Sequence, residues 1–283
     1  MIYKELEKIV LDGRRNGFSD LYIRNLLKEY LQVYILNYIY TDDKYSKELI
    51  FTGGTCLRQI YGLPRLSEDL DFDYNQEVNS RELANNLLKY FRVKYKFDDV
   101  SISLKQDGRQ ILIKIPVLKR LDLAQQDESD LLYLKIDLQK NPSGIYSTEI
   151  SSKNIMNFNF VALHYDLASL MAGKVIAVLT RERFAGKENR EVIKGRDYYD
   201  LLWFLKQTVN PNLERISDTL GEKVTGKKLK NMLDKKIEEL GNKYKSDFEA
   251  DLVPLIENPD IVPVYINNYT AEYRRNSGYI LDI

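Results

Sequence analysis

The first part of the chain has hydrophobic residues at helical spacing, and the pattern becomes strand-like further on. Leu27 and Leu31, for example, are four positions apart among polar and charged residues, and Gly13 and Gly17 interrupt the series. Apolar residues that recur every three or four positions are typical of amphipathic helices, and glycines mark breaks between them. Residues 1 to about 47 are therefore predicted to be helical.

Short apolar or alternating segments, separated by turn residues, follow this helical part. Such segments predict strands, and the turn Asp107-Gly108 between two of them favours a hairpin. A glycine pair after the first segment is followed by residues that can open a helix, and Asn141-Pro-Ser-Gly is the clearest interruption. The predicted strands are 48–52, 70–74, 100–104, 110–117, 133–138 and 158–163, and a helix is predicted over 81–91.

Beyond about residue 165 the apolar spacing is helical almost to the end of the chain. The candidate helices are 166–182, 195–206, 213–220, 227–240 and 245–256. An α/β half followed by an α half indicates the α+β class with a mixed sheet. We expect a first domain over residues 1–160 and a mainly helical domain over residues 161–283.

Composition narrows the class of protein without fixing its activity. The chain has 283 residues, 44% of them hydrophobic, and its 42 basic and 42 acidic residues give a formal net charge of +0. A net charge of zero gives no overall attraction to nucleic acid, although the composition does not exclude local basic patches. The sequence lacks the ~20-residue apolar stretch of a membrane helix, and its first residues lack a secretion signal. A soluble, cytoplasmic protein is expected.

The chain has one cysteine, Cys56, and one histidine, His164. A single thiol cannot form an intramolecular disulfide, and a single imidazole leaves no histidine pair for a metal. The sequence offers no argument for a triad partner of either residue, so both are expected to be structural. Any chemistry is therefore expected to rest on carboxylates and lysines.

Three aspartates alternate in and next to the second predicted strand. Asp69, Asp71 and Asp73 share one face, because successive side chains of a strand point to opposite sides. Their mutual repulsion is tolerated on a face that meets solvent, and it is relieved by a divalent cation bound to carboxylate oxygens. An isolated D-x-D pattern more often marks a solvated face, so the sequence context decides.

That context is a glycine turn upstream of the aspartates. Gly53, Gly54 and Thr55 lie where a predicted strand gives way to a helix, and free N–H groups there can bind phosphate. Arg65 and Ser67 follow, either as phosphate ligands or as ordinary loop residues. Nucleotidyl transfer needs both a cradle for a triphosphate and carboxylates for the metal that bridges its phosphates. The combination therefore favours such an enzyme.

Further candidates lie later in the sequence. Asp137 shares with Lys135 the polar face of a predicted strand, where it is a metal ligand, a base or a surface aspartate. Lys174 falls within the apolar stripe of a predicted helix, so it either extends to solvent or meets a negative partner. Asp197 can pair with Lys174, take part directly in the chemistry or stabilise the start of its own helix. Asp200 lies on a similar face of that helix.

Four segments of the sequence, taken in order, resemble the motifs of a known family. They are GGTCLRQIYGLPRLSEDLDF, KIDL, HYDLASLMAGKVIAVLTR and KGRDYYDLLWFL, and they run from Gly53 to Leu205. Together they resemble the AbiEii/AbiGii family of nucleotidyltransferase-like toxins. The resemblance implies a DNA-polymerase-β-like nucleotidyltransferase core and a helical domain that completes the active site. It also implies a toxin of a bacterial toxin–antitoxin or abortive phage-infection system for antiviral defence, with a cognate antitoxin as partner.

Members of this family are described as binding GTP or as moving nucleotides to RNA, including the acceptor end of tRNA. The resemblance thus implies a magnesium-dependent enzyme that transfers NMP from an NTP to an RNA acceptor, with tRNA as the first choice. Two alternatives stay open. One is a nucleotidyltransferase that modifies a small molecule or a protein hydroxyl, and the other is a GTP-binding interaction protein without catalysis.

The motifs also assign residue roles by resemblance. By resemblance, Gly54 and Thr55 hold phosphate, Ser67 lies near the nucleotide, Asp69 and Asp71 bind magnesium, and Lys174 and Asp197 complete the active site. The arguments given above add Asp137 as a catalytic residue and magnesium ligand, and add Gly53 and Arg65 to the nucleotide-binding residues.

Overall fold

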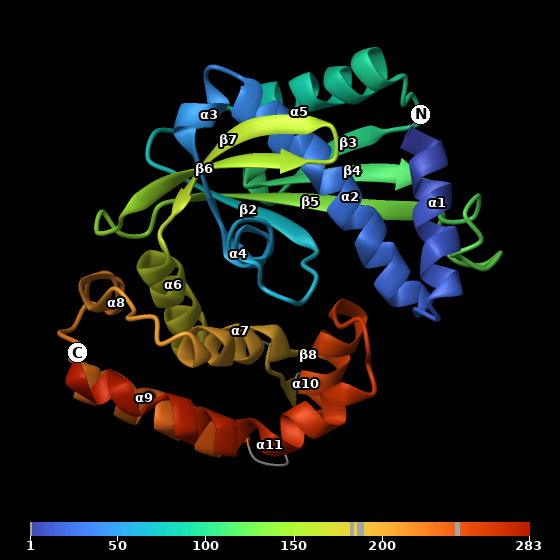
Figure 1. Cartoon of the computed structure of the whole chain (residues 1–283). Coiled ribbons are helices and arrows are strands. Elements are labelled where there is room, and N and C mark those ends of the chain that lie inside the picture. Colours follow the sequence, from blue (N-terminus) through green and yellow to red (C-terminus); the bar gives the residue numbers. More distant parts are fainter. Residues whose placement is uncertain (1, 182–183, 186–189, 241–243) are drawn as a thin grey trace. The chain divides into compact units, whose positions relative to one another are not determined.

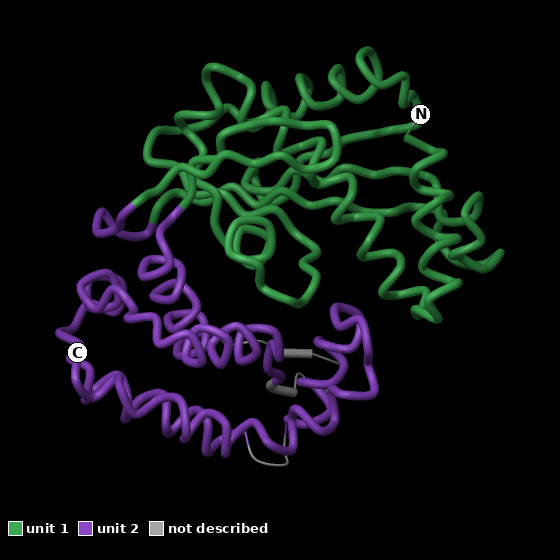
Figure 2. Tube along the Cα trace, in the orientation of Figure 1, with its two compact units in different colours: residues 1–141, 148–164 green, residues 142–147, 165–283 purple. Residues whose placement is uncertain are grey.

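The chain forms two compact units in the computed structural model (Figure 2). The structure describes residues 2–181, 184–185, 190–240 and 244–283. Unit 1 consists of residues 1–141 and 148–164, and unit 2 consists of residues 142–147 and 165–283. The last residue of the helix expected over 166–182 lies outside the described residues.

Unit 1 is built on a seven-stranded sheet (Figure 1). Its strands are β1 Leu49–Thr52, β2 Asp69–Tyr74, β3 Ser101–Lys105, β4 Gln110–Pro116, β5 Leu131–Lys140, β6 Thr148–Ile155 and β7 Phe158–Tyr165. They lie in the order β3-β4-β5-β2-β1-β7-β6. The central strands β2 and β5 are parallel, whereas β1 is antiparallel to β2 and β4 is antiparallel to β5. The expected mixed sheet is therefore confirmed.

Helices surround this sheet within unit 1. They are α1 Ile2–Arg15, α2 Asp20–Thr41, α3 Tyr45–Glu48, α4 Gly53–Tyr61 and α5 Ser80–Lys89, the last continuing into a π-helical turn at Tyr90–Lys94. The hydroxyl of Ser19 accepts a hydrogen bond from the Tyr22 N–H at 3.2 Å, which caps the start of α2. Helix α2 packs on β5 (Figure 1). The helical character predicted for the first residues is confirmed.

The core of unit 1 follows from the alternation along β2. Leu70 and Phe72 are fully buried, and the Phe72 ring stacks on Phe51 of β1 with the ring centroids 5.3 Å apart. Because side chains alternate in a strand, the apolar face of β2 directs Asp69 and Asp71 to the opposite side. Burial of the apolar face thus fixes where the acidic residues point.

Unit 2 is mainly helical, as expected. Its helices are α6 Leu167–Thr180, α7 Gly195–Lys206, α8 Leu213–Leu220, α9 Gly226–Leu240, α10 Lys245–Leu252 and α11 Ile261–Asn276, and a small sheet pairs β8 Phe184–Ala185 with β9 Arg190–Glu191. Asp166 caps α6 by accepting a hydrogen bond from the Ser169 N–H at 2.8 Å. An aromatic cluster holds the helices together, and in it the Tyr269 hydroxyl donates to the Tyr198 carbonyl at 2.8 Å.

Strand β6 and helix α11, like the short strands β8 and β9, were not predicted from the pattern of the sequence. Strand β6 lies at the edge of the sheet and most of its residues are exposed, so it needs no apolar alternation. Helix α11 carries Pro263 in its first turn, a position that proline tolerates because the N–H it lacks has no helical acceptor there. A proline in a weakly patterned stretch hides such a helix from a search for periodicity.

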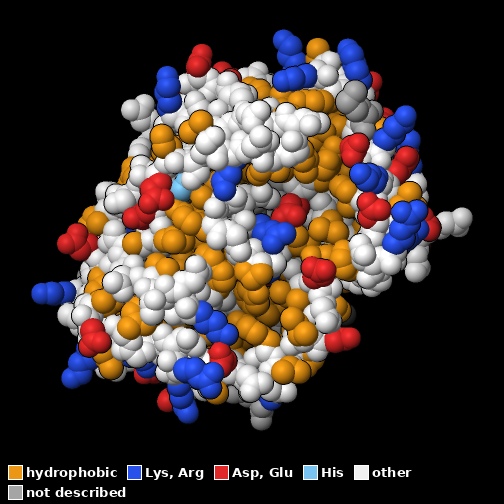
Figure 3. Space-filling view, in the orientation of Figure 1, with side chains coloured by type: hydrophobic (Ala, Val, Ile, Leu, Met, Phe, Trp, Pro, Cys, Tyr) orange, Lys and Arg blue, Asp and Glu red, His pale blue; other side chains and the backbone are white. Residues whose placement is uncertain are grey.

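None of the helices formed by the described residues combines the length and apolar character needed to cross a membrane. On the face drawn in Figure 3, acidic and basic side chains are interspersed. This distribution agrees with the formal net charge of +0.

Candidate active site

The glycine turn between β1 and α4 touches the acidic face of β2. Gly53 has a φ of +74°, and a Cβ atom at this position would overlap the Asp71 carboxylate. Both observations require glycine, because other residues rarely adopt this φ and any side chain would displace Asp71. Since Thr52 lies opposite Asp71 in the β1–β2 ladder, the strand register brings the turn to the aspartate.

Gly54 makes the second close approach, to the loop between α4 and β2. A Cβ atom here would lie 2.8 Å from the Arg65 Nη2 atom and 2.8 Å from the Ser67 Oγ atom. Arg65 is only 1% exposed, and its Nη1 atom donates to the Leu66 carbonyl at 2.8 Å. The structure thus brings Arg65 and Ser67 to the turn, with Arg65 packed inside the protein.

Thr55 links the turn to the start of β2, because its hydroxyl donates to the Asp69 carbonyl. This hydroxyl is therefore already used within the protein. The side chain of Thr52, at the N-cap position of α4, makes no capping hydrogen bond. The first N–H groups of a helix lack helical acceptors, so the start of α4 has the donors that a phosphate needs.

The carboxylates predicted on two separate strands come together on β2 and β5. Asp71 lies opposite Asp137 in the parallel ladder, and Asp69 lies opposite Lys135. The Lys135 Nζ atom is 2.9 Å from the Asp69 Oδ2 atom and 3.2 Å from the Asp137 Oδ2 atom. Gln110 of β4 donates to the Asp137 Oδ1 atom at 2.9 Å. The predicted acidic residues thus share one face of the sheet, with a lysine among them.

The charge state of Lys135 follows from these contacts. Partial burial alone would lower the pKa of its ammonium, but the Asp69 and Asp137 carboxylates outweigh burial and raise the pKa above its ordinary value. Lys135 is therefore positively charged at neutral pH.

The chemistry of this face suits a divalent cation. In the described part of the chain, no group of three or more His, Cys, Asp or Glu side chains is spaced to hold a metal ion. Magnesium does not require such a cage, because proteins usually hold it with one or two carboxylates, water and substrate phosphates. Asp69 and Asp137 already place carboxylate oxygens around one positive charge, that of Lys135. We conclude that the residues fit a magnesium ion, and its binding stays a prediction.

The remaining predicted residues form a charged cluster within unit 2. Lys174 of α6 has its Nζ atom 3.2 Å from the Asp197 Oδ1 atom and 2.7 Å from the Asp200 Oδ2 atom of α7. Arg181 also contacts the Asp197 carboxylate. The predicted pairing of Lys174 with Asp197 is confirmed, and Lys174 meets negative partners instead of extending to solvent.

Burial shapes the charges of this cluster. For Asp197, burial alone would raise the pKa of the carboxyl group, but the charges of Lys174 and Arg181 hold this pKa below its ordinary value. Burial, together with the charge of Arg196, lowers the pKa of the nearby Lys194 to about 8. Asp197 is thus ionised at neutral pH, and Lys194 loses its proton at a pH just above neutral.

The two sets of candidate residues belong to different units. Asp69, Asp71 and Asp137 lie in unit 1, whereas Lys174 and Asp197 lie in unit 2. That the helical unit completes the active site stays a prediction.

His164 and Cys56 have surroundings that suit a structural role. The His164 ring is fully buried, with its Nδ1 atom 3.2 Å from the Tyr61 hydroxyl and its Nε2 atom 2.9 Å from the Ser151 hydroxyl. Cys56 is also fully buried, which raises the pKa of its thiol well above the ordinary value. A protonated, inaccessible thiol is a poor nucleophile.

Lys135, Gln110 and Arg181 belong to these clusters but were not assigned a role from the sequence. The alternation of β5 already placed Lys135 on the face of Asp137, so its contact with that carboxylate could have been anticipated. Gln110 of β4 contacts Asp137 of the neighbouring antiparallel strand β5, and Arg181 at the end of α6 contacts Asp197 of α7. These two contacts depend on tertiary pairing, and the local pattern gave no indication of them.

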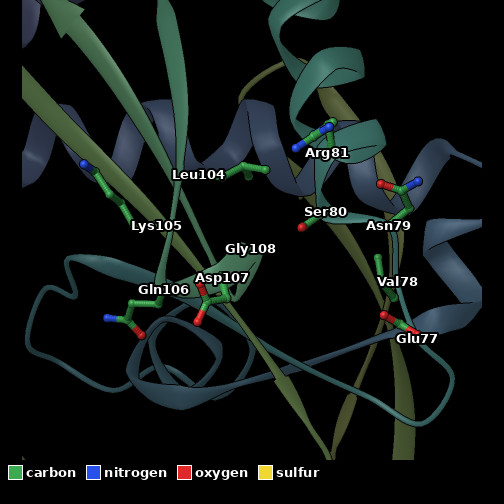
Figure 4. Close-up of a pocket in the computed structure, with 10 residues that line it drawn as sticks. All are labelled: Glu77, Val78, Asn79, Ser80, Arg81, Leu104, Lys105, Gln106, Asp107 and Gly108. Carbon is green, nitrogen blue, oxygen red and sulfur yellow. The ribbon is translucent and has the colours of Figure 1, made fainter.

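A cavity of about 890 Å³ also lies in unit 1, between segment 77–81 and segment 104–108 (Figure 4). Its wall is tightly packed at one point, because a Cβ atom at Gly108 would lie 2.7 Å from the Ser80 hydroxyl. The second segment leads into β4, whose first residue is Gln110. The cavity therefore adjoins the strand that positions Asp137.

Solved structures share this fold. MenT4, a nucleotidyltransferase toxin from Mycobacterium tuberculosis H37Rv, superposes with a TM-score of 0.60 at 16% identity, covering 97% of this chain and 90% of that chain. JHP933 from Helicobacter pylori has a TM-score of 0.50 at 18% identity, covering 91% of this chain and 92% of that chain. At such low identity these likenesses establish the fold. No curated protein matches the chain.

The sequence itself matches a family model over residues 35–272, which is most of the chain. That model describes the nucleotidyl transferase AbiEii toxin of type IV toxin–antitoxin systems. The matched span includes every candidate residue described above. The chain therefore belongs to the AbiEii family of nucleotidyltransferase toxins.

Proposed function

We propose that this toxin is a magnesium-dependent nucleotidyltransferase that moves NMP from an NTP to an RNA acceptor, and that this acceptor is tRNA. The observation that carries the proposal is the contact of the Gly53 turn with Asp71, beside Asp69 and Asp137. This arrangement places backbone N–H groups that can bind phosphate and carboxylates that can bind a cation on one face of unit 1. Family membership supports the NTP as donor and a cognate antitoxin as partner.

In this proposal the start of α4 binds the triphosphate through its backbone N–H groups. Gly53 and Gly54 keep the turn free of side chains, so that phosphates approach the backbone. Asp69, Asp71 and Asp137 hold magnesium, which offsets the charge of the phosphates when it is bound.

The reaction then needs a nucleophile, a base and a leaving group. The acceptor hydroxyl forms a bond to the α-phosphorus, and the bond from that phosphorus to the bridging oxygen of the β-phosphate breaks. Pyrophosphate leaves with the electron pair of the broken bond, and the proton of the hydroxyl passes to a water molecule, which acts as the base. Gln110 keeps the Asp137 carboxylate in place by donating to its other oxygen.

The test incubates the purified protein with total bacterial RNA, magnesium and each α-labelled NTP in turn. The variant Asp69→Ala removes a carboxylate of the site, and Asp98→Ala removes an exposed aspartate in the turn before β3 as a matched control. We expect label in tRNA with the wild type and the control, and none with Asp69→Ala or with a chelator present.

Other outcomes separate the alternatives. Label in a protein or small molecule, and none in RNA, would replace the acceptor and keep the chemistry. Bound nucleotide without any labelled product would instead support a GTP-binding interaction protein. Equal labelling by Asp69→Ala and the wild type would reject the proposed site.

A further inference from the structure

A lysine occupies the place among the carboxylates where a cation is expected. The Lys135 Nζ atom is 2.9 Å from Asp69 and 3.2 Å from Asp137, so one ammonium bridges two carboxylates on neighbouring strands. These distances are those of direct, charge-assisted hydrogen bonds. Without a positive charge between them, the two carboxylates would repel one another.

The bridge of Lys135 is open to solvent. The side chains of Lys135, Asp69 and Asp137 are 30%, 25% and 34% exposed. Ion pairs with such exposure are weak, because water and salt compete with them, and a lysine ammonium lies at the end of a long flexible stem. The ammonium can therefore leave its place without breaking a buried pair.

Gln110 holds the Asp137 carboxylate in place when the Lys135 ammonium is exchanged for a metal ion. It holds the Asp137 Oδ1 atom at 2.9 Å, so this carboxylate keeps its orientation when Lys135 departs. Asp69 is fixed through its backbone, since its carbonyl accepts the hydrogen bond of the Thr55 hydroxyl. The Asp137 carboxylate is thus held independently of the lysine, and the backbone of Asp69 keeps its place.

We propose that Lys135 is a built-in cation that holds Asp69 and Asp137 together until a divalent cation binds, and that its ammonium competes with that cation for the two carboxylates. The inference rests on the proposed function, because it concerns the same cation site. Lys135 acts through the carboxylates and is a positioning residue.

The experiment measures binding of Mn²⁺ alone, without nucleotide, from the electron paramagnetic resonance signal of the free ion. Lys135→Met removes the ammonium and keeps most of the stem. Lys140→Met, at the exposed end of the same strand, is the matched control. We expect Lys135→Met to bind Mn²⁺ about tenfold more tightly or better, because a competing positive charge within a few ångströms is gone. We expect Lys140→Met to match the wild type.

Two further variants secure the interpretation. Lys135→Arg keeps the positive charge, so its Mn²⁺ affinity should stay within about threefold of the wild type on electrostatic grounds. The double variant Asp69→Asn with Lys135→Met should lose the gain in affinity, which places the bound ion at Asp69.

Thermal unfolding provides a second readout. Without metal, Lys135→Met should melt a few degrees below Lys140→Met, because its carboxylates are no longer bridged. Mn²⁺ should then raise its melting temperature by more than that of the wild type, because only the native state binds the ion.

The outcomes distinguish this inference from the proposed function. Equal Mn²⁺ affinity in Lys135→Met and the wild type would overturn the role of Lys135 while leaving the metal site intact. Weaker binding by Lys135→Met would also overturn it, since the lysine would then assist the ion. If neither form binds Mn²⁺ alone, the competition proposed for Lys135 is overturned, and metal-dependent transfer in the presence of an NTP decides the proposed function separately.

Discussion

Each unit of the protein has a lysine held by two aspartates, but the two clusters differ in burial. In unit 1 the side chains of Lys135 and its partners are about one quarter to one third exposed. In unit 2 Lys174 is 14% exposed and Asp200 is fully buried. The first cluster can exchange its ammonium for ions from solution, whereas the second is fixed because removing an ammonium from beside buried carboxylates is costly. Similar residues therefore serve a replaceable cation in one unit and a permanent one in the other.

The largest effect should come from breaking the buried cluster. Lys174→Met leaves Asp200 without its ammonium, and we expect the free energy of unfolding to fall by about 3–5 kcal/mol. Lys206→Met is the matched control, because Lys206 lies on α7 in an exposed pair with Glu272. Its loss should cost less than about 1 kcal/mol. Urea unfolding of both variants checks the contrast, and equal losses would contradict it.

A somewhat smaller effect is expected for the glycine turn. Gly53→Ala combines a φ of +74° with overlap of the Asp71 carboxylate, so it should cost about 3 kcal/mol and stop nucleotide transfer. Gly17→Ala is the control, since Gly17 has a φ of +75° and nothing within 4 Å of the added Cβ. That change should cost about 1 kcal/mol and leave transfer unchanged. Nucleotide transfer by Gly53→Ala at the wild-type rate would show that the turn accommodates a Cβ atom without displacing Asp71.

The third effect is a pH dependence of the free energy of unfolding, caused by Lys194 in unit 2. Burial lowers the pKa of Lys194 to about 8, whereas an unfolded lysine titrates near ~10.4. Between these values the unfolded chain binds more protons, so stability should rise with pH by up to about 1.4 kcal/mol per unit. Urea unfolding from pH 7 to 10 measures this slope. Lys194→Met should flatten it and Lys206→Met should not.

The smallest effect tests how Asp137 is oriented. Gln110→Ala removes one hydrogen bond of the carboxylate, worth about 1 kcal/mol, so transfer should slow about fivefold. Gln139→Ala, on an exposed position of β5, is the control and should keep the wild-type rate. Initial rates of label transfer decide between them. An unchanged rate in Gln110→Ala would mean that Asp137 is held by other contacts.

Local patterns predicted most of the fold, and tertiary pairing decided the rest. Alternation along β2 was enough to place Asp69 and Asp71 on the face opposite Leu70, because one buried face determines the other. The polar edge strand β6 and helix α11 were missed, since neither has strong apolar periodicity.

The candidate site divides in the same way. The glycine turn and the aspartates were recognisable because each is a short motif. The bridge of Lys135 to Asp69 was not, since it depends on β2 and β5 being neighbours although they are far apart in sequence. Prediction of such contacts needs the strand order and the register, which periodicity alone does not provide.

We propose that the carboxylates of Asp69 and Asp71 carry nucleotide transfer, and a comparison of three variants of strand β2 tests this role. Asp69→Asn, Asp71→Asn and Asp73→Asn each remove one charge from the same strand with almost no change in shape. We expect the first two variants to lose transfer of labelled NMP to tRNA, while Asp73→Asn keeps a rate within about tenfold of the wild type. Equal rates in all three variants would contradict it.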